Sequence, residues 1–440
     1  MLKSNKILFV ALLASLNFLA ISVNAQTNSP YSRYGLGALK DQTTGPSRGM
    51  GGVGYGLHTS QSANPLNPAS YAQVDSLTFI FDIGVNYNST SYKENGAKDT
   101  KSNGGLDYVT ALFPLSKKLG LSFGILPFSS TGYRLGSVKT AKNELGDETT
   151  YHVLHDGSGG LSQVYLGLGY KLPIQGLTAG FNVSYLFGNL NYANELTGIS
   201  EVGSYRTAER AKLNVTSVKF DLGLQYQMKL KDMSALTLGL VYNPKINGTG
   251  KLTRLQIDPD TRLVIKELYN GSINAGTPHM FGAGAIYNYK RRMLLGFDVK
   301  YENWKGVNYS DEMNDGLNSS NRFNNRWKFA AGAEYRVAEY SQNYFQKIKF
   351  RGGLNYSNSY VNVNTEDKKI KGYNEYGATL GIGLPLTDKD AVGGRTSYLN
   401  INFEYKYLRP EQKNMVSERF FGVSLNMNIN ELWFYQRKIR

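Results

Sequence analysis

The side chains of this chain that could perform chemistry are few and widely spaced. The 440 residues contain no cysteine and four histidines, of which His152 and His155 stand beside Asp156 in a long predicted loop. A hydrolytic or metal site there would need a nearby nucleophile or further ligands, and the spacing supplies neither. We therefore predict that the protein is not an enzyme and that it uses no metal or other cofactor.

A second candidate for metal binding is the acidic pair Asp258 and Asp260, which flanks Pro259. Two carboxylates at this spacing could contribute to a Ca²⁺ site, but a calcium loop supplies a longer series of oxygen ligands. We interpret the segment as a solvated turn in a loop.

The composition excludes several classes of protein. Hydrophobic residues make up 41% and charged residues 19% of the chain, with 48 Gly and 32 Tyr. Only the N-terminus has an apolar run that approaches the roughly 20 residues of a membrane-spanning helix, so a helical membrane bundle is excluded. The net charge is +15, yet the 49 Lys and Arg residues are spread over the whole chain. We therefore predict no nucleic-acid partner.

The first residues have the pattern of an export signal. Lys3 and Lys6 precede an uncharged apolar run over residues 7–21, and Val23–Ala25 has the small residues of a cleavage site. We predict a signal peptide over residues 1–25, followed by an exported mature chain. Without cysteine, that chain cannot be anchored through a lipid-modified N-terminal Cys.

Residues 26–75 differ from the rest of the chain. They are rich in Gly, Ser, Asn and Pro, lack periodicity, and contain the runs Gly49–Gly54 and Asn64–Ser70. A flexible linker is one interpretation. Because nearly all unstructured connections in compact domains are shorter and these dipeptides form turns, we favour an ordered plug.

From about residue 76 the hydrophobic pattern has a period of two, which is typical of half-buried strands. The first run alternates apolar residues from Leu77 to Tyr87 with smaller or polar residues such as Asp82 and Asn86. The pattern recurs up to about residue 430, and predicts roughly fourteen strands of about 10 to 14 residues, the length that crosses a bilayer. A soluble β-sandwich or propeller has strands of about half that length.

The predicted connections alternate strictly between short and long. Short connections fall near residues 114, 172, 230, 290, 341 and 390, and the others are longer. This asymmetry, with an even strand count, is typical of outer-membrane barrels whose termini both lie in the periplasm. The fold class we predict is all-β: a transmembrane antiparallel β-barrel over residues 76–430, with a basic periplasmic tail over residues 431–440.

The polar positions of these runs would then face the lumen. They carry charges of both signs, which can pair with one another or with a plug and therefore need not mark a charged substrate. These predicted lumen residues are Asp82, Lys219, Asp221, Asp298, Lys300, Glu302, Lys328, Glu334, Arg336, Lys349, Arg351, Glu404 and Lys406.

The chain resembles the FadL family of outer-membrane transporters for long-chain fatty acids and other hydrophobic compounds, including the PorV-like barrels of the type IX secretion system. The resemblance rests on Arg48–Gly54, with Gly51 and Gly52, and on Asn67-Pro68-Ala69 just before the first strand. It implies a plug, called a hatch, inside the barrel, with Asn67, Pro68 and Ala69 matching its signature.

The family also has a distorted third strand that opens a gap towards the bilayer. Here the corresponding run contains Gly124 and Pro127. Gly weakens a strand and Pro cannot donate to a ladder, so we expect an interruption there on backbone grounds. The alternative interpretation is a simple strand end, in which Pro127 terminates the strand at the membrane surface.

We predict passive uptake of hydrophobic or amphipathic, fatty-acid-like molecules across the outer membrane, with lateral exit near Gly124 and Pro127. The alternative is a non-transporting barrel that is a subunit of a secretion or assembly complex; an ion-permeable porin is disfavoured by the plug. The expected partners are outer-membrane lipid and lipopolysaccharide, a hydrophobic small-molecule ligand, and outer-membrane or periplasmic proteins.

Overall fold

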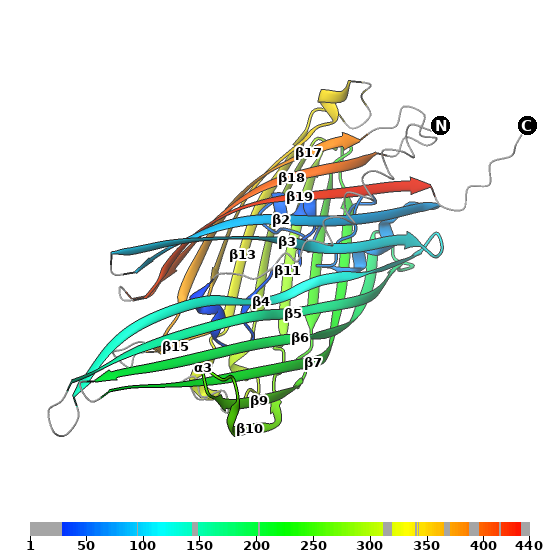
Figure 1. The fold of residues 1–440 in the computed structure, drawn as a ribbon. Helices are drawn as coiled ribbons and strands as arrows, with labels where there is room; N and C mark the ends of the chain where they lie inside the picture. The colour runs from blue at the N-terminus through cyan, green and yellow to red at the C-terminus, as the bar shows by residue number, and fades with distance from the viewer. Residues whose placement is uncertain are drawn as a thin grey trace, which may run out of the picture.

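The computed structural model describes residues 29–94, 96–142, 148–200, 203–310, 319–338, 341, 343–364, 370–386, 396–412 and 415–432. Within them, fourteen antiparallel strands form a closed barrel (Figure 1), which confirms the predicted fold class. Each strand pairs with its neighbour in the barrel, and the last strand pairs with the first to close it. The predicted signal peptide and residues 433–440 of the predicted tail lie outside the described residues.

The barrel strands follow one another in the chain, interrupted only by short elements in the loops. They are β2 (Thr78–Glu94), β3 (Ala97–Pro114), β4 (Leu119–Lys142), β5 (Glu148–Lys171), β6 (Leu177–Ser200), β7 (Gly203–Lys229), β8 (Ala235–Asn243), β11 (Met280–Tyr289), β12 (Met293–Glu302), β13 (Arg326–Arg336), β14 (Lys349–Asn358), β17 (Tyr373–Leu386), β18 (Ser397–Pro410) and β19 (Ser417–Leu432). The remaining elements are η1 (Pro30–Arg33), β1 (Ala38–Leu39), α2 (Gly45–Gly49), η2 (Pro68–Gln73), β9 (Thr249–Ile257), β10 (Val264–Asn274), η3 (Trp304–Gly306), α3 (Ser319–Arg322), η5 (Tyr344–Lys347), β15 (Val363–Asn364) and β16 (Ile370–Lys371).

The period of two separates an apolar outer face from a polar inner face. Outward side chains such as Phe297 and Leu380 are 51% and 66% exposed, whereas the alternating Asp82 and Asp298 are buried. An apolar surface of this kind is what a bilayer requires of a barrel. None of the thirteen charged residues predicted to face the lumen is exposed, so that prediction is confirmed.

Four neighbouring strands are much longer than predicted. β4, β5 and β6 have 24 residues each and β7 has 27, so they project beyond the barrel at the end with the long connections (Figure 1). The predicted strict alternation of short and long connections is wrong here, because only two residues separate β2 from β3 and β6 from β7. There β7 pairs with β9, which pairs with β10, and these two strands lie within a segment predicted to be a loop. The projecting parts carry mostly polar residues and only scattered buried apolar ones, such as Tyr133, Leu190 and Leu213, so the continuous hydrophobic pattern used to bound the strands ends before they do.

Residues 29–74, here called the inner segment, lie against the inner face of the barrel wall (blue in Figure 1). Their backbone touches wall glycines so closely that an added Cβ at Gly239 would lie 2.0 Å from the Tyr55 oxygen, and one at Gly332 2.2 Å from the Met50 oxygen. Only glycine allows two backbones to approach in this way. We call these wall residues the glycine belt: Gly120, Gly169, Gly180, Gly239, Gly332 and Gly353.

Apolar side chains fill the lumen above the inner segment, towards the long connections. Trp304, Phe323 and Tyr360 are at most 2% exposed, and their rings pack against one another with centroids 4.5 to 5.9 Å apart. Leu36 of the inner segment belongs to the same cluster. The loops after β12 and β14 therefore fold down onto the inner segment instead of leaving a wide opening.

Among the described residues, no helix has the length and apolar character needed to cross a membrane.

The glycine belt predicts a steric test of the packing. We expect Gly239→Ala to lower the free energy of unfolding by about 3 kcal/mol or more, because its Cβ would overlap the Tyr55 oxygen. Urea unfolding in detergent micelles, followed by tryptophan fluorescence, measures this. Gly136→Ala is the matched control, because a Cβ there meets no atom within 4 Å; equal stability of the two variants would contradict the close contact.

Candidate functional site

Asn67 of the predicted plug signature fixes the inner segment to the wall. Its side-chain nitrogen donates to the carbonyl oxygens of Tyr55 (2.8 Å) and Leu224 (3.1 Å), and its side-chain oxygen accepts from the Ala69 amide (3.1 Å). The last bond caps η2, with Pro68 in the first turn, where its missing N–H leaves no unpaired donor. Asn67, Pro68 and Ala69 are therefore brought together at one buried structural junction.

Gly51 and Gly52 lie on the opposite side of the lumen, in a turn that follows α2. Both have positive φ, +71° and +94°, which glycine adopts without a steric penalty. The Gly51 amide donates to Thr379 Oγ1 (2.8 Å), and its carbonyl accepts from Asn355 (3.2 Å). The glycine run and the Asn-Pro-Ala run thus hold the inner segment at two separate places on the wall.

Ion pairs connect the inner segment to the wall between these two places. Arg48 lies 2.5 Å from Asp107 of β3, and Asp41 lies 2.5 Å from Lys328 of β13. Asp298 of β12 accepts two backbone bonds, from the Gly54 and Tyr55 amides, at 2.7 and 2.9 Å. Because these groups have little contact with water, their pairing is much stronger than that of surface charges.

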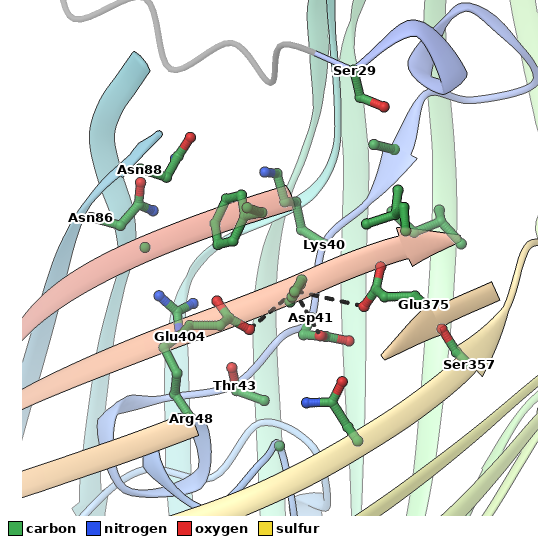
Figure 2. Close-up of a pocket in the computed structure, with 18 of the residues that line it drawn as sticks. Ser29, Lys40, Asp41, Thr43, Arg48, Asn86, Asn88, Ser357, Glu375 and Glu404 are labelled. Carbon is green, nitrogen blue, oxygen red and sulfur yellow. Dashed lines mark ion pairs between the residues drawn. The ribbon is translucent and has the colours of Figure 1, made fainter. Parts of the chain in front are cut away.

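Lys406 of β18 is at the centre of a larger charged cluster (Figure 2). Its Nζ lies 3.1 Å from Glu404, 3.8 Å from Glu375 and 3.9 Å from Asp41. Burial opposes ionisation of Asp41, but Lys328 and then Lys406 hold its pKa well below the ordinary value. Burial, together with Lys406, lowers the pKa of the neighbouring Lys40 to about 8. The cluster is therefore ionised but balanced in sign.

Two small cavities flank residues 40–43 of the inner segment. The first, of about 150 Å³, lies towards β2, β3 and β17–β19 and contains the Lys406 cluster (Figure 2). The second, of about 100 Å³, lies towards β7, β8 and β11–β13 and mixes apolar residues such as Phe128 and Leu66 with charges such as Lys219 and Asp221. Neither is a continuous apolar passage; each is smaller than the roughly 300 to 1,000 Å³ of common ligand pockets.

Gly124 and Pro127 lie where the third barrel strand separates from its neighbour. β3 and β4 pair over six residue pairs only, from Pro114–Gly120 to Val109–Ile125, and then diverge (Figure 1). Gly124 is within this short ladder, and Pro127 follows its last pair. The barrel therefore has a seam between β3 and β4 towards the long connections.

The inner segment covers the edge of β4 beyond the seam. β1 pairs antiparallel with Ser129 and Ser130, the Lys40 amide donates to the Phe128 oxygen (2.9 Å), and the Ser29 amide donates to the Gly132 oxygen (2.8 Å). A strand edge left open in an apolar environment would be costly. Here the inner segment takes the place that β3 leaves.

The remaining candidate residues form no site. His152 and His155 lie on β5, not in a loop as predicted, and His155 contacts Asn194 (2.6 Å). Asp258 accepts bonds from the amides of Asp260 and Thr261 in the turn between β9 and β10, and Asp260 pairs with Arg206. Within the described part of the chain, no cluster of three or more His, Asp or Glu residues is placed to bind a metal ion.

Comparison with known proteins gives a family and a fold. A family model described as BamG matches residues 1–440. Among curated protein sequences, none is significantly similar to the chain.

Solved structures of hydrophobic-compound channels share the fold, which confirms the predicted resemblance to FadL-type barrels. The P. putida toluene transporter TodX has 16% identity and a TM-score of 0.58, covering 90% of this chain and 100% of TodX. A Pseudomonas aeruginosa FadL homologue has 14% identity and a TM-score of 0.57, covering 89% and 99%. The CymD monoaromatic hydrocarbon channel has 15% identity and a TM-score of 0.55, covering 92% and 100%.

The buried ion pairs predict how the inner segment responds to loss of charge. We expect Asp41→Asn to lower the free energy of unfolding by about 3 kcal/mol, because Lys328 is left buried without its carboxylate. The double variant Asp41→Asn with Lys328→Met should recover much of that loss. Urea unfolding measures both, with Asp258→Asn in the exposed turn as control; a double variant as unstable as the single one would contradict the pairing.

Proposed function

Because the chain belongs to the BamG family, we propose that it is a barrel of the outer membrane that carries no cargo and acts as a subunit of a larger protein assembly. The observation that supports this most directly is the fixed inner segment. Buried ion pairs at Asp41 and Arg48 and the backbone contacts of the glycine belt hold it in the lumen. A lumen filled in this way suits a rigid scaffold.

The proposal includes the orientation and the domains of the chain. The end with the short connections faces the periplasm, as in outer-membrane barrels generally. Residues 1–25 are a signal peptide that is removed, residues 26–75 form a plug, residues 76–430 the barrel, and residues 431–440 a basic periplasmic tail. The apolar outer face contacts membrane lipid, and the long projecting strands pass through the lipopolysaccharide layer.

The second candidate is passive uptake of a hydrophobic or amphipathic molecule with lateral exit. It is favoured by the fold of the hydrophobic-compound channels and by the seam beside Gly124 and Pro127. The ligand would pass the outer loops, displace the plug around Asn67 and leave between β3 and β4. Gly51, Gly52, Pro68 and Ala69 would then belong to the moving part.

Uptake would require a large free energy from the ligand. Displacing the inner segment separates buried charges such as Arg48 and Asp107, and breaking one such pair costs about 3 to 5 kcal/mol. A ligand can supply only its difference in affinity between the closed and open states. A molecule small enough for the two cavities beside residues 40–43 has few contacts with which to do so, and this favours the subunit role.

Native mass spectrometry of the barrel, extracted gently from its own membrane, distinguishes the two functions. We expect a protein partner in stoichiometric amount and no small-molecule adduct, because the lumen is occupied by the chain itself. The extracted complex should keep its partner when Pro127 is replaced by Ala.

A bound fatty acid or similar amphiphile would overturn the subunit proposal, provided that it is lost in Asn67→Ala or Pro127→Ala and retained in Gly136→Ala. An added Cβ at Gly136 would meet no atom within 4 Å, so its substitution controls for handling of the variants. Detection of neither adduct in a folded, native preparation would also count against a stable subunit.

A further inference from the structure

A polar patch with a net positive charge lies on the outer surface of the wall, just beyond its apolar part and towards the long connections. It is formed by β6, β7, β9 and β10, which are paired side by side (green in Figure 1). We call it the outer patch. Its residues form two adjacent rows across these strands: Asn189, Asn214, Lys251 and Ser272 in the row nearer the apolar surface, and Asn191, Lys212, Thr253 and Asn270 in the next.

The alternation of side chains assigns the outer patch to the outward face of the wall. Val218 and Phe220 of β7 are exposed on the apolar outer surface. Lys212 and Asn214 are separated from them by an even number of residues, whereas Leu213 is buried in the apolar cluster of the lumen. β6 and β7 pair over this whole length without a register shift, so each side chain keeps its face. The outer patch therefore meets the surroundings of the barrel and not its lumen.

Aromatic side chains border the outer patch on the side of the apolar surface. Tyr185 and Phe187 of β6 lie on the same face, and their rings stack with centroids 5.8 Å apart. Asn189 follows Phe187 after two residues, which is about 7 Å further along the strand. Aromatic residues of barrels gather at the boundary between the hydrocarbon and the polar headgroups. The outer patch therefore lies at the depth of the headgroups on the proposed outer side of the membrane.

The two lysines of the outer patch can reach a single anion. Lys212 stands opposite Thr253, and Lys251 stands opposite Asn214, so the lysines are diagonal neighbours on β7 and β9. Long side chains at such positions are within reach of one another and of a common ligand. Both lysines are exposed, and among the described residues neither takes part in an ion pair or a side-chain hydrogen bond.

The charge of these lysines is not neutralised by the residues around them. The outer patch contains no carboxylate. In the row beyond it, Asp156 lies 3.9 Å from Arg134, and Glu267 accepts a bond from the Asn270 side chain (3.2 Å). That row also contains the exposed Arg210, so its own charges are balanced in sign. A surface of one sign of charge attracts ligands of the opposite sign.

We propose that the outer patch binds the phosphorylated sugar head group of lipopolysaccharide, with the acyl chains of that molecule on the apolar surface below. The two lysines supply charge-assisted bonds to phosphate, and the amides of Asn189, Asn191 and Asn214 can donate to phosphate and sugar oxygens. The patch extends over four strands, about 14 Å at the usual strand spacing, which suits a disaccharide better than the small head group of a phospholipid. The inference goes beyond the proposed function and is independent of the choice between its two candidates.

Native mass spectrometry of the full-length, delipidated barrel in detergent, titrated with purified rough lipopolysaccharide, tests the site. We expect Lys212→Glu with Lys251→Glu to weaken binding at least about tenfold, because two attractive contacts become repulsive. Lys212→Arg with Lys251→Arg keeps the charge and should bind as the unsubstituted protein does. Lys117→Glu with Lys118→Glu, exposed in the turn between β3 and β4 at the other end of the barrel, is the control with the same change of net charge.

Two further probes identify the group that is bound. Lipopolysaccharide dephosphorylated with hydrofluoric acid should bind the unsubstituted barrel as weakly as intact lipopolysaccharide binds the Glu variant. Phosphatidylglycerol should bind the unsubstituted barrel and the Glu variant equally, because its head group is too small to use both rows of the outer patch. A loss of phosphatidylglycerol as large as that of lipopolysaccharide would make the patch a general site for anionic phospholipid and overturn the inference.

Three other results would also overturn the inference: no lipopolysaccharide adduct on the unsubstituted barrel, equal weakening in the Glu variant and in the control, or undiminished binding of the dephosphorylated molecule. Asn67→Ala should leave the lipopolysaccharide adduct unchanged, because Asn67 lies in the lumen and the outer patch lies outside it. An adduct that depends on Lys212 and Lys251 but not on Asn67 is therefore distinguished from a cargo molecule in the lumen, and the subunit proposal is tested separately from this site.

Discussion

The close contact between the inner segment and the glycine belt is the constraint on which the rest of this molecule depends. At Gly239 and Gly332 the two backbones touch without an intervening side chain. A barrel of fourteen strands is wide enough to leave a channel, and side chains alone would fill it imperfectly. By removing side chains from the wall along a belt, the chain brings a second layer of backbone into direct contact with the first.

Backbone contact at this depth requires every polar group of the inner segment to find a partner. Wall side chains provide them: Thr379 and Asn355 bond Gly51, and Asp298 bonds the amides of Gly54 and Tyr55. This accounts for the charges of the inner wall without any cargo. The lumen is polar because it binds peptide backbone. The charges of Asp41 and Arg48 of the inner segment are neutralised by ion pairs with Lys328 and Asp107 of the wall.

The fold could be predicted from the sequence because a bilayer imposes a strict pattern on each strand. Asp82 and Lys328 had to face inwards once their neighbours faced lipid, and Pro127 had to interrupt a ladder because it has no N–H. The alternation of apolar and polar residues ends where the strands extend beyond the bilayer. The outer parts of β4–β7 bury only scattered apolar residues such as Leu190 and Leu213, too few for a period of two to reveal the strands. His155 was therefore assigned to a loop although it pairs within a sheet.

The candidate site was less accessible to sequence reasoning, since its signals depend on partners distant in the chain. A glycine within a strand, such as Gly239, indicates a close approach without identifying the approaching group. The motif Asn67-Pro68-Ala69 drew attention to the inner segment, but the bonds from Asn67 to Tyr55 and Leu224 could not be derived from spacing.

Opening of the seam and movement of the inner segment are coupled. Where β3 leaves β4, β1 pairs with Ser129 and Ser130, so the edge of β4 is satisfied only while the inner segment is in place. The same segment is anchored to β3 through the ion pair of Arg48 with Asp107. The inner segment is therefore attached to the strands on both sides of the seam. Opening the seam alone would remove hydrogen bonds from β4 in an apolar environment. Moving the inner segment alone would break the ion pair between Arg48 and Asp107 of β3. The two motions must therefore occur together or not at all, so the contacts that hold the inner segment in place also hold the seam closed.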